Sequence, residues 1–182
     1  MKRLLLGTIL GTMVTLGLAG QSVAAGLLSI DGIQGTSAIP GKQGWINIES
    51  VQWGHGTLPS ASGKTAAPPE FQPITIVKQL DATSPILALA ATPAGMNHPK
   101  AAIELTIAGR ETQVPYARIE LEQVRVTSYQ ASANGSGSPA PTESITLSYG
   151  KIRWVYFPTD PRGGKAGAPV TTGFDLRTGQ KF

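Results

Sequence analysis

Short runs of alternating apolar and polar residues, separated by loops rich in glycine, proline and serine, dominate the chain after its first 25 residues. The clearest run covers residues 101–108, where Ile103, Leu105 and Ile107 share one parity. Successive side chains of a strand point to opposite faces, so this spacing predicts a half-buried strand. The repeated pattern favours a mainly β fold.

The apolar parity changes within three of the predicted strand segments. The changes fall between Ile48 and Val51, between Leu121 and Val124, and between Tyr149 and Ile152. A strand exchanges its inner and outer faces where a bulge or a sharp bend interrupts the regular alternation. Repeated bends curve a sheet, and the sequence therefore predicts a small closed β-barrel.

One segment, 84–91, predicts a short α-helix. Ser84 has a side chain suited to the N-cap, and Pro85 suits the first helical position. Pro93 and Gly95 end the helix. A helix of about two turns is unstable alone, so we expect it to flank the barrel.

Residues 1–25 predict a secretory signal peptide. Lys2 and Arg3 precede an uncharged apolar stretch over 4–19, and Ala25 supplies a small residue at the expected cleavage site. The apolar stretch is short for a membrane span, although an uncleaved anchor is the alternative. We predict an exported protein, periplasmic or extracellular, with no membrane span after cleavage.

The remaining 157 of the 182 residues, 26–182, are of a length typical of one domain. The chain contains no cysteine, which excludes disulfides, thiol catalysis and thiolate metal sites. Without Lys2 and Arg3, 13 basic residues face 11 acidic ones. The basic residues are scattered, so the sequence does not predict nucleic-acid binding.

The sequence predicts neither an enzyme nor a bound cofactor. His55 and His98 are the two histidines, and each lies beside glycine or proline in a predicted solvated loop. No other histidine or carboxylate stands at metal-ligand spacing from them. Glu120 and Glu122 share one parity of a strand, which indicates exposed charges rather than a catalytic pair.

Five segments carry a more specific pattern when they are taken together and in order. They are residues 45–54, 78–87, 119–130, 141–156 and 169–176. This ordered run resembles the Hcp family, the ring-forming tube proteins of type VI secretion systems. The resemblance extends from Leu27 to Phe182.

The resemblance implies a six-membered ring of β-barrels that stacks into a tube, with a lumen that can hold effector proteins. It also implies contacts with tube-tip and sheath proteins. An extended loop bridges the ring faces in this family, and the residues assigned to that inter-subunit loop here are Gly54, His55, Lys64 and Phe71. Such tube proteins lack a secretory signal, so the signal peptide departs from the family pattern.

The leading hypothesis from the sequence is therefore a self-assembling structural protein of the secretion tube. The alternative is an exported β-barrel that binds a peptide, a glycan or a small protein without assembling into tubes. A hydrolase ranks third, because it would require His55, His98, Glu120 or Glu122 to converge in space.

Overall fold

The computed structural model of the chain describes residues 23–57, 69–108, 113–133, 135, 140–160 and 164–182. The signal peptide predicted from the sequence lies mostly outside the described residues. The first elements are β1 (Val23–Ile30), β2 (Ile46–Ile48), β3 (Ser50–Gln52), β4 (His55–Gly56), β5 (Glu70–Phe71), β6 (Ile74–Gln79) and α1 (Ser84–Ala90). The remaining elements are β7 (His98–Ala108), β8 (Gln113–Ser132), β9 (Thr142–Ser148), β10 (Lys151–Tyr156), β11 (Val170–Asp175) and β12 (Gln180–Lys181).

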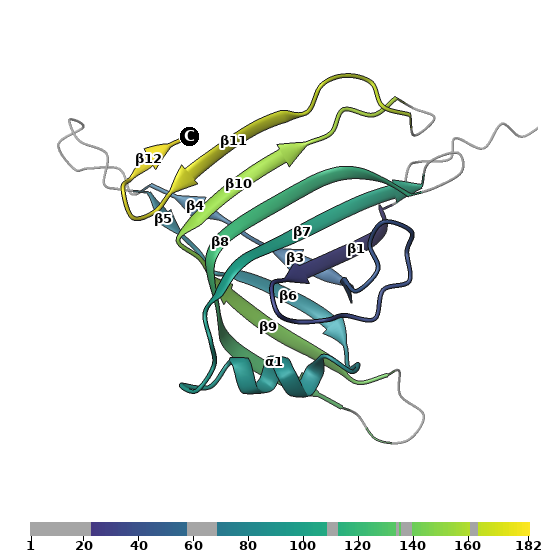
Figure 1. Cartoon of the computed structure of the whole chain (residues 1–182), viewed down its shortest axis with the longest axis vertical. Coiled ribbons are helices and arrows are strands. Elements are labelled where there is room, and N and C mark those ends of the chain that lie inside the picture. Colours follow the sequence, from purple (N-terminus) through teal and green to yellow (C-terminus); the bar gives the residue numbers. More distant parts are fainter. Residues whose placement is uncertain (1–22, 58–68, 109–112, 134, 136–139, 161–163) are drawn as a thin grey trace, which may run out of the picture.

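The long strand β8 joins two layers of antiparallel strands (Figure 1). A hydrogen-bonded path runs β12-β11-β10-β8-β7-β1-β2, and a branch at β8 continues through β9 and β6 to β3. The first half of β8 pairs with β7 and β10, whereas its second half pairs with β9. One strand therefore belongs to both layers and sets the angle between them.

The change of partner along β8 occurs at Gln123. This residue has a φ of 56°, in the left-handed region that non-glycine residues rarely adopt. Opposite it, β9 ends and β10 begins around Gly150, whose N–H donates to the Glu122 carbonyl at 2.9 Å. The bends predicted from the parity changes at these positions are confirmed.

The third predicted bend lies at Glu49, between β2 and β3. β2 pairs with β1, β3 pairs with β6, and the Glu49 N–H donates to the Val77 carbonyl at 2.8 Å. The prediction of a mainly β fold is confirmed, and the described residues contain one helix, as expected. The prediction of a closed barrel is wrong, because two three-residue strands with different partners do not continue one ladder around the molecule.

The helix α1 packs against β8 near one end of the molecule (Figure 1). Leu87 and Ala90 are buried, while Ile86 and Leu89 face outward. Ser84 is the first helical residue rather than the N-cap predicted from the sequence. Its hydroxyl accepts from the Asp81 N–H at 2.9 Å, a bond that closes the preceding turn and leaves the cap position to Thr83.

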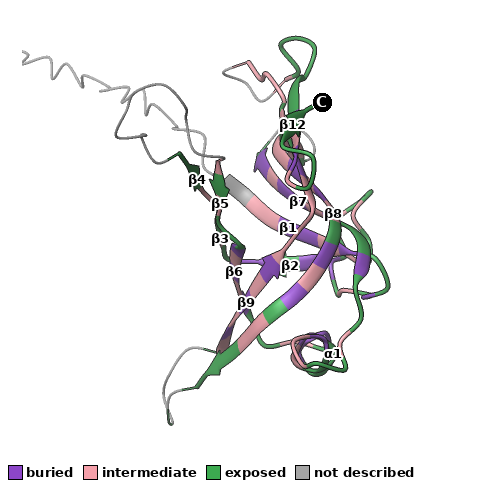
Figure 2. Cartoon of the chain, turned by 90° about the vertical axis from the view of Figure 1, so that its left-hand side faces the viewer, coloured by how far each residue is buried: buried purple, intermediate pink, exposed green. Residues whose placement is uncertain are grey.

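The core lies between the two layers, and the buried positions alternate along its strands (Figure 2). Its largest fully buried apolar members include Leu28, Ile46, Ile74, Ile76, Leu87, Ile103, Leu121, Ile145, Leu147 and Ile152. Each fully buried aliphatic side chain contributes about 1.5–3 kcal/mol through removal from water. This burial holds the layers together in a chain that has no disulfide.

The outer face of β7 is also covered. Glu104 points away from the apolar core and is fully buried. Lys42, from the loop between β1 and β2, places its ammonium 2.7 Å from one Glu104 oxygen, and the Arg118 Nε donates to the other at 2.8 Å. Two cations therefore neutralise the carboxylate, and one of them fastens the β1–β2 loop to the sheet.

Candidate functional site

The structure brings together three of the four residues that the sequence assigned to an inter-subunit loop. Gly54 directly precedes β4, and His55 stands opposite Phe71 in the β4–β5 ladder. Lys64 lies outside the described residues. The prediction that His55 belongs to a loop is wrong, because the segment returns on itself and forms a two-stranded stem.

Aromatic rings connect this stem to the larger sheet. The Phe71 ring lies between His55 and Phe174, at centroid distances of 5.0 Å to each. Trp154 of β10 approaches both stem residues, at 5.5 Å from His55 and 6.2 Å from Phe71. The four rings form one cluster, the aromatic joint, between the stem and strands β10 and β11.

A half-buried tyrosine provides a second attachment. Tyr149, directly after β9, donates its hydroxyl hydrogen to the Gln72 carbonyl at 3.0 Å. Burial raises the pKa of the Tyr149 hydroxyl to about 12. The group therefore stays protonated and able to donate throughout the neutral pH range.

An apolar cleft opens beside the aromatic joint. Its volume is about 130 Å³, and it is lined by Val51, Trp53, Ile103, Leu105, Ala117, Arg118, Ile119, Trp154, Val155 and Tyr156. Trp53 is 41% exposed and Tyr156 is 44% exposed, although both are large aromatic side chains. Exposed aromatic groups gathered at a cleft are typical of a surface that is covered by another molecule.

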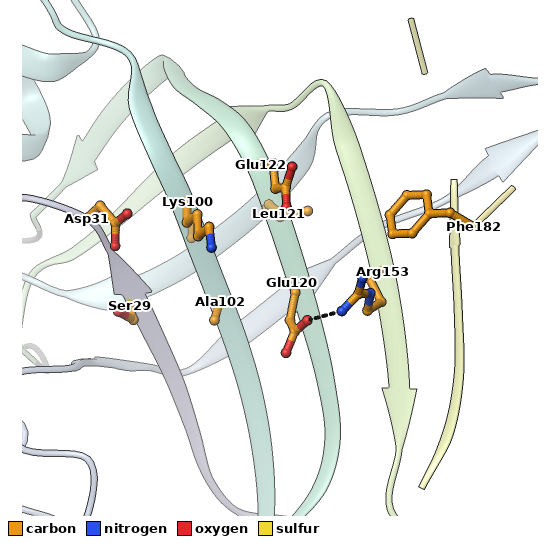
Figure 3. Close-up of a pocket in the computed structure, with 10 residues that line it drawn as sticks. Ser29, Asp31, Lys100, Ala102, Glu120, Leu121, Glu122, Arg153 and Phe182 are labelled. Carbon is orange, nitrogen blue, oxygen red and sulfur yellow. Dashed lines mark hydrogen bonds and ion pairs between the residues drawn. The ribbon is translucent and has the colours of Figure 1, made fainter. Parts of the chain in front are cut away.

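The outer face of the larger sheet carries charges of alternating sign (Figure 3). Lys100 lies opposite Glu122, Glu122 opposite Lys151, and Lys151 opposite Asp175 along one row across β7, β8, β10 and β11. Figure 3 shows Glu120 directed toward Arg153, with 3.5 Å between the charged atoms. Cross-strand pairs of opposite charge stabilise a sheet, and these strands offer no continuous basic surface for phosphates.

The groups that a hydrolase would require do not converge. Glu120 and Glu122 are paired with Arg153 and Lys151 on the outer face. His98 begins β7 and is 7% exposed, so its predicted position in a solvated loop is wrong. Its Nδ1 lies 2.7 Å from the Asp31 carbonyl oxygen, which fixes the ring in the fold. Among the described residues, no three potential metal ligands gather in one place.

Sequence reasoning missed the partners of the stem. The residues predicted for the inter-subunit loop include neither Trp154 nor Phe174, and the sequence does not predict their cluster with His55 and Phe71. The two pairs are about 80–120 residues apart in the chain, and no local periodicity connects them. The available signal was the presence of aromatic residues on two neighbouring strands, Trp154 and Phe174, in a chain whose long loop also carries aromatic rings.

Comparison with known proteins identifies the family. Residues 27–156 match the family described as "Type VI secretion system effector, Hcp". The chain belongs to the Hcp family. The resemblance seen in the sequence is thus confirmed, and the protein is an Hcp-like type VI secretion protein.

Individual Hcp proteins support the assignment. Protein hcp1 of Pseudomonas aeruginosa PAO1 is 33% identical over 106 residues, which are 58% of this chain and 64% of that relative. A solved type six secretion system protein has a TM-score of 0.79 and 27% identity, covering 87% of this chain and 99% of its own. Hcp1 of Salmonella typhimurium shares the fold, with a TM-score of 0.71 and 20% identity over 88% of this chain and 100% of its own.

The Hcp fold here contains a single short helix in its described part. α1 spans seven residues. No helix within the described ranges has the length and apolar character required to cross a bilayer.

Proposed function

We propose that this chain is an exported structural protein that assembles into hexameric rings, which stack into a tube. The family match over residues 27–156 carries the proposal. In it, residues 1–25 direct export and are removed, and the domain 26–182 forms the ring subunit. The assembled protein works in the periplasm or outside the cell.

Two surfaces of the described chain support self-assembly. The cleft beside the aromatic joint exposes Trp53 and Tyr156. On β11, residues 170–172 pair with β10 on one side and have no described strand on the other. Tyr156 pairs with Val170 in the β10–β11 ladder, so the cleft and this open edge lie side by side and form one contact area. Contact between this area and a different area of the next subunit closes into a ring when the rotation between subunits allows it.

The ring lumen would hold small effector proteins, and the ring ends and outer wall would contact tube-tip and sheath proteins. The protein itself would be neither an enzyme nor a carrier of a cofactor. Contacts with effector proteins and with the other secretion proteins would then depend on complementary shape and charge. The row of alternating charges on the outer sheet face offers such complementarity.

Native mass spectrometry of the exported, purified chain, with negative-stain imaging of the same sample, tests the proposal. We expect a species of six times the monomer mass at micromolar concentration, and ring-shaped particles. A strictly monomeric protein over the same concentration range would contradict ring assembly.

A variant of the open strand edge sharpens this test. The Gly173 N–H bonds to Phe182 on the outer side of β11, so the Thr171 N–H, two residues earlier, points to the same open side. Thr171→Pro removes that donor without breaking the β10 ladder. We expect weaker ring formation with Thr171→Pro and unchanged assembly with Thr171→Val.

The second candidate function is an exported binding module, which the apolar cleft favours. A peptide with an apolar side chain could fill the space beside Trp53 and Trp154. A monomeric protein whose tryptophan fluorescence changes in a saturable way with such a peptide would support this function instead.

A further inference from the structure

The stem formed by β4 and β5 is too small to hold its own position. It contains two residue pairs, His55 with Phe71 and Gly56 with Glu70. One further backbone bond, from the Gln72 N–H to the Gly54 carbonyl at 3.0 Å, extends it. A two-stranded hairpin of this size is not stable alone, so contacts with the rest of the protein must fix its direction.

The aromatic joint supplies ring contacts of this kind. The stem rings of His55 and Phe71 are nearly parallel, with an angle of 16° between their planes. Phe71 stacks on Phe174 of β11 at an angle of 25°, and it lies at the same angle to Trp154 of β10. Planar stacking constrains both the distance and the tilt of the stem, which a single flexible contact would not do.

The joint and the Tyr149 hydroxyl contact neighbouring residues at the end of β5. Tyr149 holds the carbonyl of Gln72, directly after β5, while the rings hold the stem one residue earlier, at Phe71. The stem is thus attached to β10, β11 and the residue that follows β9, so its attachments come from both layers of the fold. These contacts with the packed sheets therefore fix the direction of the stem.

The stem also presents binding groups. Gly56, Thr57, Glu70 and Gln72 are exposed and line a shallow hollow. Within the described residues, β4 and β5 pair only with each other, so both outer edges of the stem keep free backbone donors and acceptors. An open strand edge that is held in a fixed direction is suited to pairing with another chain.

We propose that His55, Phe71, Trp154 and Phe174 are positioning residues that orient the β4–β5 stem for contact with a second copy of this chain. The inference rests on the proposed ring assembly. It means that the affinity between subunits depends on the aromatic joint, which lies inside one subunit, as well as on the residues that touch between subunits.

The test compares Phe71→Ala, the conservative Phe71→Tyr and the control Tyr116→Ala in the exported, purified protein. Tyr116 is an exposed aromatic residue that pairs with Tyr156 rather than with the joint. Hydrogen exchange of the peptides covering 54–57 and 70–72 reports on the stem, and native mass spectrometry reports on assembly. Thermal unfolding reports on the fold.

We expect Phe71→Ala to speed exchange in the stem at least tenfold and to weaken assembly at least tenfold. Its melting temperature should fall no further than that of Tyr116→Ala. Phe71→Tyr should keep slow exchange and normal assembly, because a ring remains to stack on Phe174. Tyr116→Ala should leave the stem peptides unchanged.

Three results would overturn the inference. Unchanged stem exchange in Phe71→Ala would show that the joint does not hold the stem, and faster exchange with normal assembly would show that stem direction does not matter. Faster exchange throughout the protein would make Phe71 an ordinary core residue. A wild-type chain that never assembles would contradict the proposed function instead, while the exchange data would still report on the joint.

Discussion

Lys78 and Glu143 bury opposite charges in the interior, next to the start of α1. Both side chains have no exposed surface, and their charged atoms lie 2.7 Å apart. Asp81 approaches the same ammonium at 2.9 Å, and the Tyr129 hydroxyl donates to the second oxygen of Glu143 at 2.9 Å. Every charge here has a partner, which is the condition under which buried charges are tolerated.

Removing one partner of this pair should destabilise the fold strongly. We expect Lys78→Met to lower the free energy of unfolding by about 3–5 kcal/mol, because Glu143 then remains buried without its cation. Adding Glu143→Leu should recover a large part of that loss, as apolar side chains replace the pair. Urea unfolding of the two single variants and the double variant measures the coupling. If the double variant lost the sum of the two single-variant losses in unfolding free energy, the predicted coupling of Lys78 and Glu143 would be contradicted.

Asp81 should make stability depend on acid pH. Partial burial raises the pKa of Asp81, but hydrogen bonds from the Thr83 hydroxyl, Lys78 and the Thr83 N–H outweigh burial, so the pKa is lowered from 3.8. A lowered folded-state pKa adds stability above the unfolded value, and this stability is lost as pH falls below about 4 through the folded value.

The free energy of unfolding of the wild type should decrease as the pH falls from neutral to below about 4. We expect this decrease to be smaller in Asp81→Asn. Chemical unfolding at several pH values measures this slope. Asp31→Asn removes the same charge from an exposed position and serves as the control. An equal slope in wild type and Asp81→Asn would contradict the assignment.

At the scale of elements, the corner of the fold depends on the close contact of two residues. A Cβ atom at Gly150 would overlap the side-chain amide of Gln123, and the three nearest atoms all belong to Gln123. Gln123 itself occupies the left-handed region, where β8 changes partners. The absence of a side chain at one position therefore makes room for the bent strand opposite.

Gly150→Ala should cost about 0.5–1.5 kcal/mol of unfolding free energy, because the added methyl group forces the exposed Gln123 side chain out of its present rotamer. Combined with Gln123→Gly, which removes the overlapping atoms, the same change should cost much less. A double-mutant cycle by urea unfolding measures the difference. Equal costs of Gly150→Ala in both backgrounds would contradict the contact.

For the whole molecule, the pairing of β1 is compatible with cleavage after Ala25. The ladder with β7 is irregular between Val23 and Ala25, and it runs without a shift from Ala25 to Ile30. Gly26 is also the first residue that pairs with β2. A chain that begins at Gly26 therefore keeps the regular part of its N-terminal strand except Ala25, which pairs with Thr106.

We expect the chain exported from a bacterial host to begin at Gly26, as measured by intact mass. Ala25→Arg should block processing, because signal peptidases require a small residue at this place, and the precursor should accumulate. Thr57→Arg introduces the same side chain at an exposed position and should be processed normally. A full-length wild-type product would contradict the predicted signal peptide.

Local sequence patterns were sufficient to predict the mainly β class, the helix at 84–90 and the places where strands bend. These features follow from neighbouring residues: alternation in 101–108, Pro85 near the start of α1, and parity changes that coincide with Glu49 and Gln123. The ordered segments also determined the family, which residues 27–156 confirm.

The pairing of the strands, the open sheet and the burial of particular polar residues could not be predicted from local patterns and became clear from the three-dimensional structure. His98 has the local sequence of a loop and Lys78 the charge of a surface residue, yet both are buried because distant elements supply their partners. The aromatic joint likewise unites residues from the two halves of the chain. Such contacts depend on long-range packing free energy, which no local pattern of residues encodes.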